Sequence, residues 1–239
     1  MKRAERHHLK ENELQRAATE VRRFYSERQQ QASWVFAVAG AVAVVALGYF
    51  FWREHVQSRA HELLAQATTV QDARIAVPGT PDAKGTFPTE RARLQAALVK
   101  FKAAADAYPS TDAGLFARSQ EAAGQLALGN SALAITAYQD VIARAGSSSI
   151  YAQTARLGLA EAQARGGQYD QAISTFRDLS QRKDGPLPVD GILMQLGRTY
   201  RDAGKRADAQ VTFNRIVQEF PDSPFTADAK RELETLNKS

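Results

Sequence analysis

Residues 196–221, LGRTYRDAGKRADAQVTFNRIVQEFP, decide the fold of this chain. The stretch reads as two helices that are separated by Gly204 and ended by Pro221. A glycine can end a helix in a left-handed cap, and a proline cannot continue one. Ala209 is small enough to let two antiparallel helices cross closely, and Phe213, one turn later, can fill the gap toward a neighbouring hairpin. The stretch therefore predicts a helical hairpin.

The same spacing recurs along the chain and predicts a repeat. Small residues followed four positions later by an aromatic residue stand at intervals of 37, 38 and 37 residues. Pro109 closes the first of these units as Pro221 closes the last, and Gly129 and Gly167 each stand five residues before a small residue. Stacked hairpins of this period form solenoids, so we predict an all-α fold. The pairs are Ala97 with Phe101, Ala134 with Tyr138, Ala172 with Phe176, and Ala209 with Phe213.

The repeat resembles the tetratricopeptide repeat, and its last copy is the best match. The copy before it, at Ala160, also matches, whereas the one at Ala122 has Glu121 where leucine is usual. The unit that ends at Pro109 has only its second helix in place, because a loop at residues 75–90 separates it from its first. An alanine-rich helical bundle without a superhelix is the alternative. On the signature positions of the last copy stand Leu196, Gly197, Tyr200, Ala209, Phe213 and Pro221.

The final segment, SPFTADAKRELETL (residues 223–236), predicts one more helix that closes the solenoid. Serine is favoured at the residue that caps a helix N-terminus, and proline is favoured at the first helical position. We therefore expect Ser223 to cap this helix and Pro224 to begin it.

Residues 34–52, WVFAVAGAVAVVALGYFFW, are a second distinctive stretch, with nineteen residues and no charge. As a helix they extend about 28 Å, close to the roughly 30 Å thickness of a bilayer hydrocarbon core. Trp34 and Trp52 stand at the two ends, where aromatic rings favour the headgroup region. A secretory signal peptide fits poorly, because no small-residue cleavage site follows the stretch. A buried core helix is the other alternative to the transmembrane helix that we predict.

The flanking charges predict an orientation. Four arginines stand within the twenty residues before the span, and two within the twenty after it. Because basic residues favour the cytoplasmic side, we predict an inner-membrane, single-pass protein with a cytoplasmic N-terminus and a periplasmic C-terminal domain. The predicted divisions are a charged tail (1–33), the transmembrane helix (34–52), a juxtamembrane helix with a Pro/Gly loop (53–90), and the repeat domain (91–239).

Composition argues against catalysis and against nucleic-acid binding. The formal charge is +5, but residues 1–33 hold eight Lys/Arg against five Asp/Glu, so much of it lies outside the domain that would grip phosphates. No cysteine occurs and no histidine follows His61, which removes Ser–His and Cys–His catalysis and imidazole or thiolate metal sites from that domain. We therefore predict that the protein is not an enzyme, with no catalytic residues, no metal and no cofactor.

The tetratricopeptide resemblance implies that the first helices of the hairpins line a groove that holds other polypeptides. Mixed apolar and basic side chains in such a groove would suit an extended peptide. The alternative is that each of these residues is an ordinary surface or inter-repeat packing residue. The candidate groove positions are Phe116, Leu126, Glu161, Arg165, Met194, Arg198 and Arg201.

The order of a short inner tail, one span and an outer repeat domain resembles the YfgM-type ancillary subunit of the bacterial Sec translocon. This resemblance implies an adaptor beside the protein-conducting channel, with translocon subunits, a periplasmic chaperone and exported chains as partners. The segment EFPDSPFTADAKREL (residues 219–233) is also similar to repeats of outer-membrane assembly and cell-division coordinators. Those proteins are lipoproteins or soluble periplasmic proteins. An envelope scaffold for a wall or division complex is therefore the alternative function.

Overall fold

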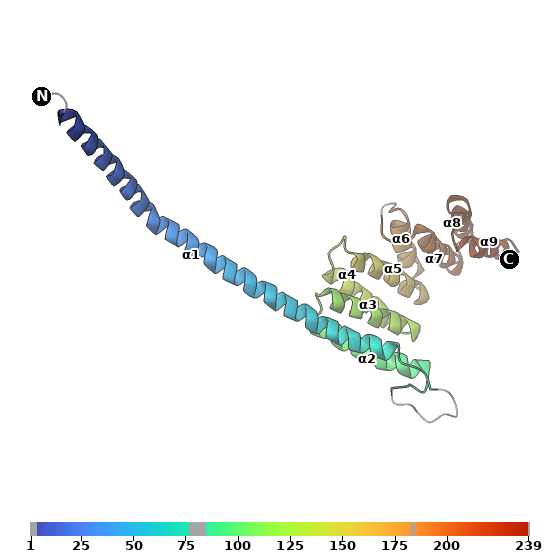
Figure 1. Ribbon diagram of the computed structural model, residues 1–239. Coiled ribbons are helices and arrows are strands. Elements are labelled where there is room, and N and C mark those ends of the chain that lie inside the picture. Colours follow the sequence, from blue (N-terminus) through green and yellow to red (C-terminus); the bar gives the residue numbers. More distant parts are fainter. Residues whose placement is uncertain (1–3, 77–84, 183–184, 239) are drawn as a thin grey trace. The chain divides into compact units, whose positions relative to one another are not determined.

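The computed structural model describes residues 4–76, 85–182 and 185–238, and for residues 4–33, 35 and 36 it describes the backbone alone. Within this part the chain forms nine α-helices and no strand, so the all-α prediction is confirmed (Figure 1). An isolated parallel bridge joins Ile75 to Phe87. The helices are α1 (Ala4–Gln71), α2 (Glu90–Ala107), α3 (Asp112–Ala127), α4 (Ser131–Arg144), α5 (Ile150–Arg165), α6 (Tyr169–Ser180), α7 (Val189–Asp202), α8 (Arg206–Glu219) and α9 (Thr226–Lys238).

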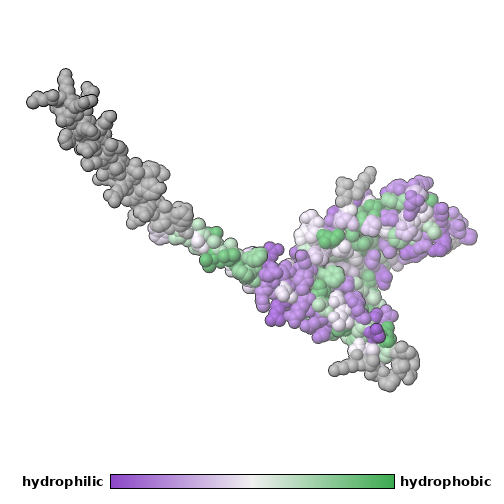
Figure 2. Space-filling model, in the orientation of Figure 1, coloured by the Kyte–Doolittle hydropathy of each residue, from purple (hydrophilic) through white to green (hydrophobic). Residues whose placement is uncertain are grey.

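The chain divides into two compact units, Met1–His55 and Val56–Ser239. In the first unit α1 carries the apolar stretch. Among the described residues, Ala37–Gln71 is the one helical segment long and apolar enough to cross a membrane, and none of its most apolar window is buried. Figure 2 shows hydrophobic residues gathered on the N-terminal portion of this segment, which holds the apolar stretch. Because these side chains are exposed, the alternative of a buried core helix is not found.

The second unit is a stack of four helical hairpins closed by α9 (Figure 1). The hairpins pair residues 56–71 of α1 with α2, α3 with α4, α5 with α6, and α7 with α8. Ala67 of α1 packs with Ala97 and Phe101 of α2, so the end of α1 supplies the first helix that the first repeat lacked in the sequence. The first helices of neighbouring hairpins also touch, α3 against α5 and α5 against α7.

A glycine cap ends the first helix of each later hairpin, as the sequence predicted. Gly129, Gly167 and Gly204 have φ of 85°, 77° and 73°, the left-handed conformation that glycine adopts without strain. The residue after each glycine donates its backbone N–H to the carbonyl oxygen five residues earlier, at 2.9, 2.8 and 2.8 Å. This pattern satisfies carbonyls that a helix end leaves without partners. The three hairpins therefore turn in the same way.

The second helices of the first and last hairpins also end alike. Tyr108, after α2, has φ −135° and ψ 58°, and Phe220, after α8, has φ −133° and ψ 59°. Pro109 and Pro221 come next, and neither helix continues through its proline. Both prolines therefore stop a helix, as the sequence predicted.

The repeat positions singled out in the sequence form the interior of the stack. The small residues Ala97, Ala134, Ala172 and Ala209 are fully buried, and the aromatic residue one turn after each of them is buried as well. A Cβ atom built on Gly197 would come within 2.5 Å of the Phe213 ring, so α7 and α8 approach too closely there for alanine without a shift. The packing is therefore dense at the crossing of the last hairpin.

Arg118 of α3 ties three helices together through charge. Its guanidinium donates from Nη1 to Glu121 at 2.6 Å, and lies 2.5 Å from Asp106 of α2 and 3.2 Å from Asp140 of α4. The side chains of Arg118 and Glu121 are only 15% and 11% exposed. Glu121 therefore replaces the usual leucine of the repeat as part of a partly buried ion-pair network.

The closing helix begins later than predicted. Helix α9 starts at Thr226, whereas the sequence suggested Ser223 as its cap and Pro224 as its first residue. The Ser223 hydroxyl instead donates to Asp190 of α7 at 2.6 Å and accepts from the Phe225 N–H at 3.1 Å. Because Ser223 is bonded across to α7, residues 221–225 form turns that precede the helix.

Candidate protein-interaction cleft between helices α5 and α7

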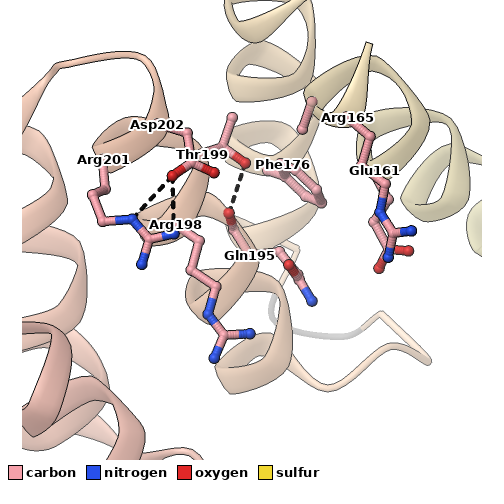
Figure 3. Close-up of a pocket in the computed structure, with 9 residues that line it drawn as sticks. Glu161, Arg165, Phe176, Gln195, Arg198, Thr199, Arg201 and Asp202 are labelled. Atoms are coloured by element: carbon pink, nitrogen blue, oxygen red, sulfur yellow. Dashed lines mark hydrogen bonds and ion pairs between the residues drawn. The ribbon is translucent and has the colours of Figure 1, made fainter. Parts of the chain in front are cut away.

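A cavity of about 190 Å³ lies between α5 and α7, the first helices of two neighbouring hairpins. Polar and charged side chains from both helices surround it, and Phe176 of α6 contributes an apolar wall (Figure 3). We refer to this cavity and its lining as the α5–α7 cleft. The lining residues are Glu161, Ala164, Arg165, Phe176, Gln195, Arg198, Thr199, Arg201 and Asp202.

Helical spacing places these residues on two facing stripes. Glu161 and Arg165 are one turn apart on α5, and the lining residues of α7 recur at three- and four-residue intervals from Gln195. Helix α5 is held at its start by the Ser149 hydroxyl, which accepts from the Ala152 N–H at 3.2 Å. Phe176 is itself buried in the core beneath, so the apolar wall of the cleft is fixed.

Glu161 is the electrostatically unusual residue of the cleft. Its side chain is partly buried, and within the described part of the chain it makes no hydrogen bond and no ion pair. Burial raises the pKa of Glu161, and the positive charge of Arg165 opposes that rise without forming an ion pair. Burial also raises the pKa of the neighbouring Tyr138 to about 12, with the charge of Glu161 acting in the same direction. A carboxylate in such a place is poorly compensated.

The two arginines of α7 are held by the closing helix. Arg201 donates from Nη1 to Glu232 of α9 at 2.6 Å and from Nη2 to its neighbour Asp202 at 2.9 Å. Arg198 lies 3.5 Å from Glu232 and 3.7 Å from Asp228, and it makes no hydrogen bond to either. Ion pairs therefore close the contact between α7 and α9.

The repeat position that Arg198 occupies at the α7–α9 contact has no charged partner at the α5–α7 contact. Arg198 holds in α7 the position that Glu161 holds in α5, thirty-seven residues earlier. Where Arg198 faces Glu232 across to α9, Glu161 has no charged partner across to α7 in the described residues. Of the α5–α7 and α7–α9 contacts, the α5–α7 contact is therefore the one at which a charged side chain has no partner among the described residues.

Four of the seven predicted groove residues meet in this cleft: Glu161, Arg165, Arg198 and Arg201. Phe116 is exposed on α3 and does not line the cavity. Leu126 and Met194 require correction as groove residues, because they are only 7% and 1% exposed and pack in the core.

Sequence reasoning missed Ala164, Gln195, Thr199 and Asp202 and treated Phe176 only as a repeat residue. Gln195 and Asp202 could have been found from the helical spacing, since they stand three residues before and four residues after Arg198. Nothing in the sequence marks Phe176 as a wall of the cleft.

The described residues contain no cluster of three or more His, Asp or Glu side chains that could hold a metal ion. In the cleft the carboxylates Glu161 and Asp202 are accompanied by arginines. The cleft therefore offers hydrogen-bonding groups, charges and one aromatic wall.

Stacked hairpins with a cleft between their first helices define a tetratricopeptide-like repeat domain, a class typical of protein–protein interaction. Residues 115–239 match the family model YfiO, described as an outer membrane lipoprotein. Because the match covers more than half of the chain, the protein belongs to this family. The family assignment supports the repeat fold.

Solved structures with the same fold include the nearly identical TPR-like repeats of a putative kinesin light chain from Podosopora anserina. That structure has 15% sequence identity and a TM-score of 0.58, and the match covers 76% of this chain and 87% of that one. A single-substitution variant of it matches with the same identity and TM-score and with 86% of its chain covered. At this identity the likeness shows the fold alone. No curated protein matches the sequence.

Proposed function

We propose that this protein is a membrane-anchored adaptor that holds partner polypeptides in the α5–α7 cleft. The observation that carries the proposal is the cleft itself, in which Glu161 and Arg165 have no partner among the described residues. Glu161 is partly buried, and a partly buried charge without a partner weakens a fold, so its presence is better explained by a group that is supplied from outside. The repeat architecture supports a polypeptide as that group.

The anchor in this proposal is the apolar part of α1. Residues 34–52 have the length and aromatic ends of a membrane span, and α1 is helical throughout them. The family is described as outer membrane lipoproteins, but the 239 residues contain no cysteine to carry a lipid. We therefore propose a single-pass inner-membrane protein with residues 1–33 in the cytoplasm and the repeat domain in the periplasm, as the arginine distribution favours.

The finer proposal is a translocon-associated, chaperone-like subunit. The sequence resemblance to the YfgM-type ancillary subunit supports it, together with a cleft that suits an extended chain. On this proposal the partners are exported polypeptides, Sec translocon subunits and a periplasmic chaperone. An inner-membrane scaffold for a wall or division complex is the second candidate, supported by the family assignment to an envelope protein.

A pull-down from membranes in mild detergent through a C-terminal tag, read by mass spectrometry, tests these proposals. Channel subunits and a periplasmic chaperone among the recovered proteins would support the translocon role. Wall-synthesis or division proteins in their place would replace that role with scaffolding. Equal recovery of partners from a variant that lacks the repeat domain would contradict the adaptor proposal itself.

Protease treatment of spheroplasts tests the orientation separately. A periplasmic repeat domain should be digested in intact spheroplasts, whereas a cytoplasmic one would be protected until the membrane is opened. Protection would overturn the proposed topology and point to an adaptor that faces the cytoplasm.

A further inference from the structure

We infer that the polypeptide segment bound in the α5–α7 cleft presents a lysine or arginine side chain that pairs with Glu161. This inference rests on the proposed function, because it names the chemistry of the partner at the same cleft. It starts from the charge on Glu161, which no other described group neutralises by direct contact.

No cation of the cleft is in direct contact with Glu161 in the described structure. Arg201 is engaged by Glu232 and Asp202, at 2.6 and 2.9 Å. Arg198 is drawn toward α9, where Glu232 and Asp228 lie at 3.5 and 3.7 Å. Arg165, one turn from Glu161 on the same helix, makes no ion pair with it within the described structure. Direct contact with Glu161 is therefore left open to a cation from another chain.

At the next contact of the stack, the position that corresponds to Glu161 is paired with an opposite charge. At the α7–α9 contact, the residue equivalent to Glu161 is Arg198, and a carboxylate from the next helix faces it. The α5–α7 contact offers Gln195 in the place of that carboxylate, thirty-seven residues before Glu232. A basic side chain that entered between Glu161 and Gln195 would supply the opposite charge that the next helix supplies at α9.

The shape and lining of the cleft suit a long basic side chain better than a small cation. Ala164 and the ring of Phe176 offer apolar surface, and Glu161 offers the charge. Lysine and arginine carry an apolar stem and a charged head, so they can bury the stem against such a wall while the head reaches a carboxylate. An acidic side chain would instead face the uncompensated charge of Glu161.

The test places a photo-crosslinking amino acid at position 195 of the full-length chain in its native membranes. Crosslinked segments are identified by mass spectrometry, and the yield is compared among wild type, Glu161→Gln and Glu161→Lys. Glu234→Gln, an exposed carboxylate on α9, is the matched control. Circular dichroism of each purified variant establishes that the repeat domain is folded.

We expect the crosslinked segments to contain a lysine or arginine beside the crosslinked residue. We also expect Glu161→Gln to lower the yield about tenfold or more, at the low end of the range measured for close charge pairs at interfaces. Glu161→Lys should shift the recovered segments toward those with Asp or Glu, and Glu234→Gln should change nothing.

The two ways of failing are distinguishable. Crosslinks that persist undiminished in folded Glu161→Gln, or that map to segments without basic residues, overturn this inference and leave the proposed function standing. If position 195 yields no crosslink to any polypeptide, the cleft is not the binding site, and the proposed function falls together with the inference.

Discussion

Arg118→Ala should destabilise the repeat domain more than removal of any exposed arginine. The change leaves Glu121 without the donor that it has at 2.6 Å, in a side chain only 11% exposed. Asp106 and Asp140 are more open to water, so losing their ion pairs with Arg118 costs less. Breaking a buried ion pair costs about 3–5 kcal/mol and an exposed one well under 1, so for this partly buried network we expect a loss of about 2–4 kcal/mol.

The assay is urea unfolding of the full-length protein in mild detergent, followed by circular dichroism at about 222 nm, which reports helix content. Arg215→Ala is the control, because among the described residues Arg215 pairs only with Glu219, one turn away on an exposed surface. We expect it to cost about 0.5 kcal/mol or less. Adding Glu121→Leu to Arg118→Ala should restore part of the loss, because it removes the uncompensated carboxylate. A loss within about 0.5 kcal/mol of the Arg215→Ala value would refute the reasoning.

Three further predictions concern packing, pH and the membrane. Gly197→Ala should cost about 1–3 kcal/mol of unfolding free energy in urea, because its Cβ would meet the Phe213 ring at 2.5 Å; an unchanged unfolding midpoint would contradict the close crossing. Burial raises the pKa of Glu161 in the folded protein. Protonation of Glu161 therefore stabilises the fold at pH values below the ordinary carboxyl pKa, and this stabilisation is lost as the pH rises through the pKa of the folded state. The unfolding free energy of Glu161→Gln relative to that of wild type should therefore increase between about pH 4 and pH 7. A difference in unfolding free energy that stays constant across this range would contradict the prediction. Val44→Arg puts a charge near the middle of the proposed span, at a cost of roughly 2.5–3.5 kcal/mol. It should lower the fraction of the protein that resists alkaline extraction from membranes, and full resistance would speak against the span.

The hairpins could be predicted from sequence because their determinants are local. Gly129, Gly167 and Gly204 each need only their own backbone conformation and the helix before them to end that helix. Pro109 and Pro221 act in the same local way. The repeat period then follows from the sequence spacing, and the all-α solenoid follows from the period.

The cleft could be predicted only in part, because it depends on how successive hairpins rotate against each other. Met194 and Arg198 stand four residues apart on α7, and the sequence assigned both to the groove. In the structure Arg198 lines the cleft, while Met194 is turned into the core between hairpins. A difference of this kind is set by the packing angle between hairpins, which no single repeat encodes.

The hydrogen-bond and ion-pair partners of polar and charged residues also could not be predicted from the sequence. Glu121 stood out as a departure from the repeat, but its reason lies in Arg118 and in Asp106 on another helix. Ser223 had the residue type and spacing of a helix cap, yet its hydroxyl bonds to Asp190, thirty-three residues away in sequence. Contacts between distant segments decide such cases.

Filling the α5–α7 cleft tests the central claim most directly. Ala164→Phe would place a ring inside the cavity, and Ala143→Phe, an exposed alanine on α4, makes the same chemical change outside it. Partner recovery from membranes through a C-terminal tag is then compared for the two folded variants and the wild type. The account predicts at least a roughly tenfold loss of partners for Ala164→Phe, equivalent to about 1.4 kcal/mol, and wild-type recovery for Ala143→Phe. Equal recovery from both variants would contradict the claim that the cleft holds the partner.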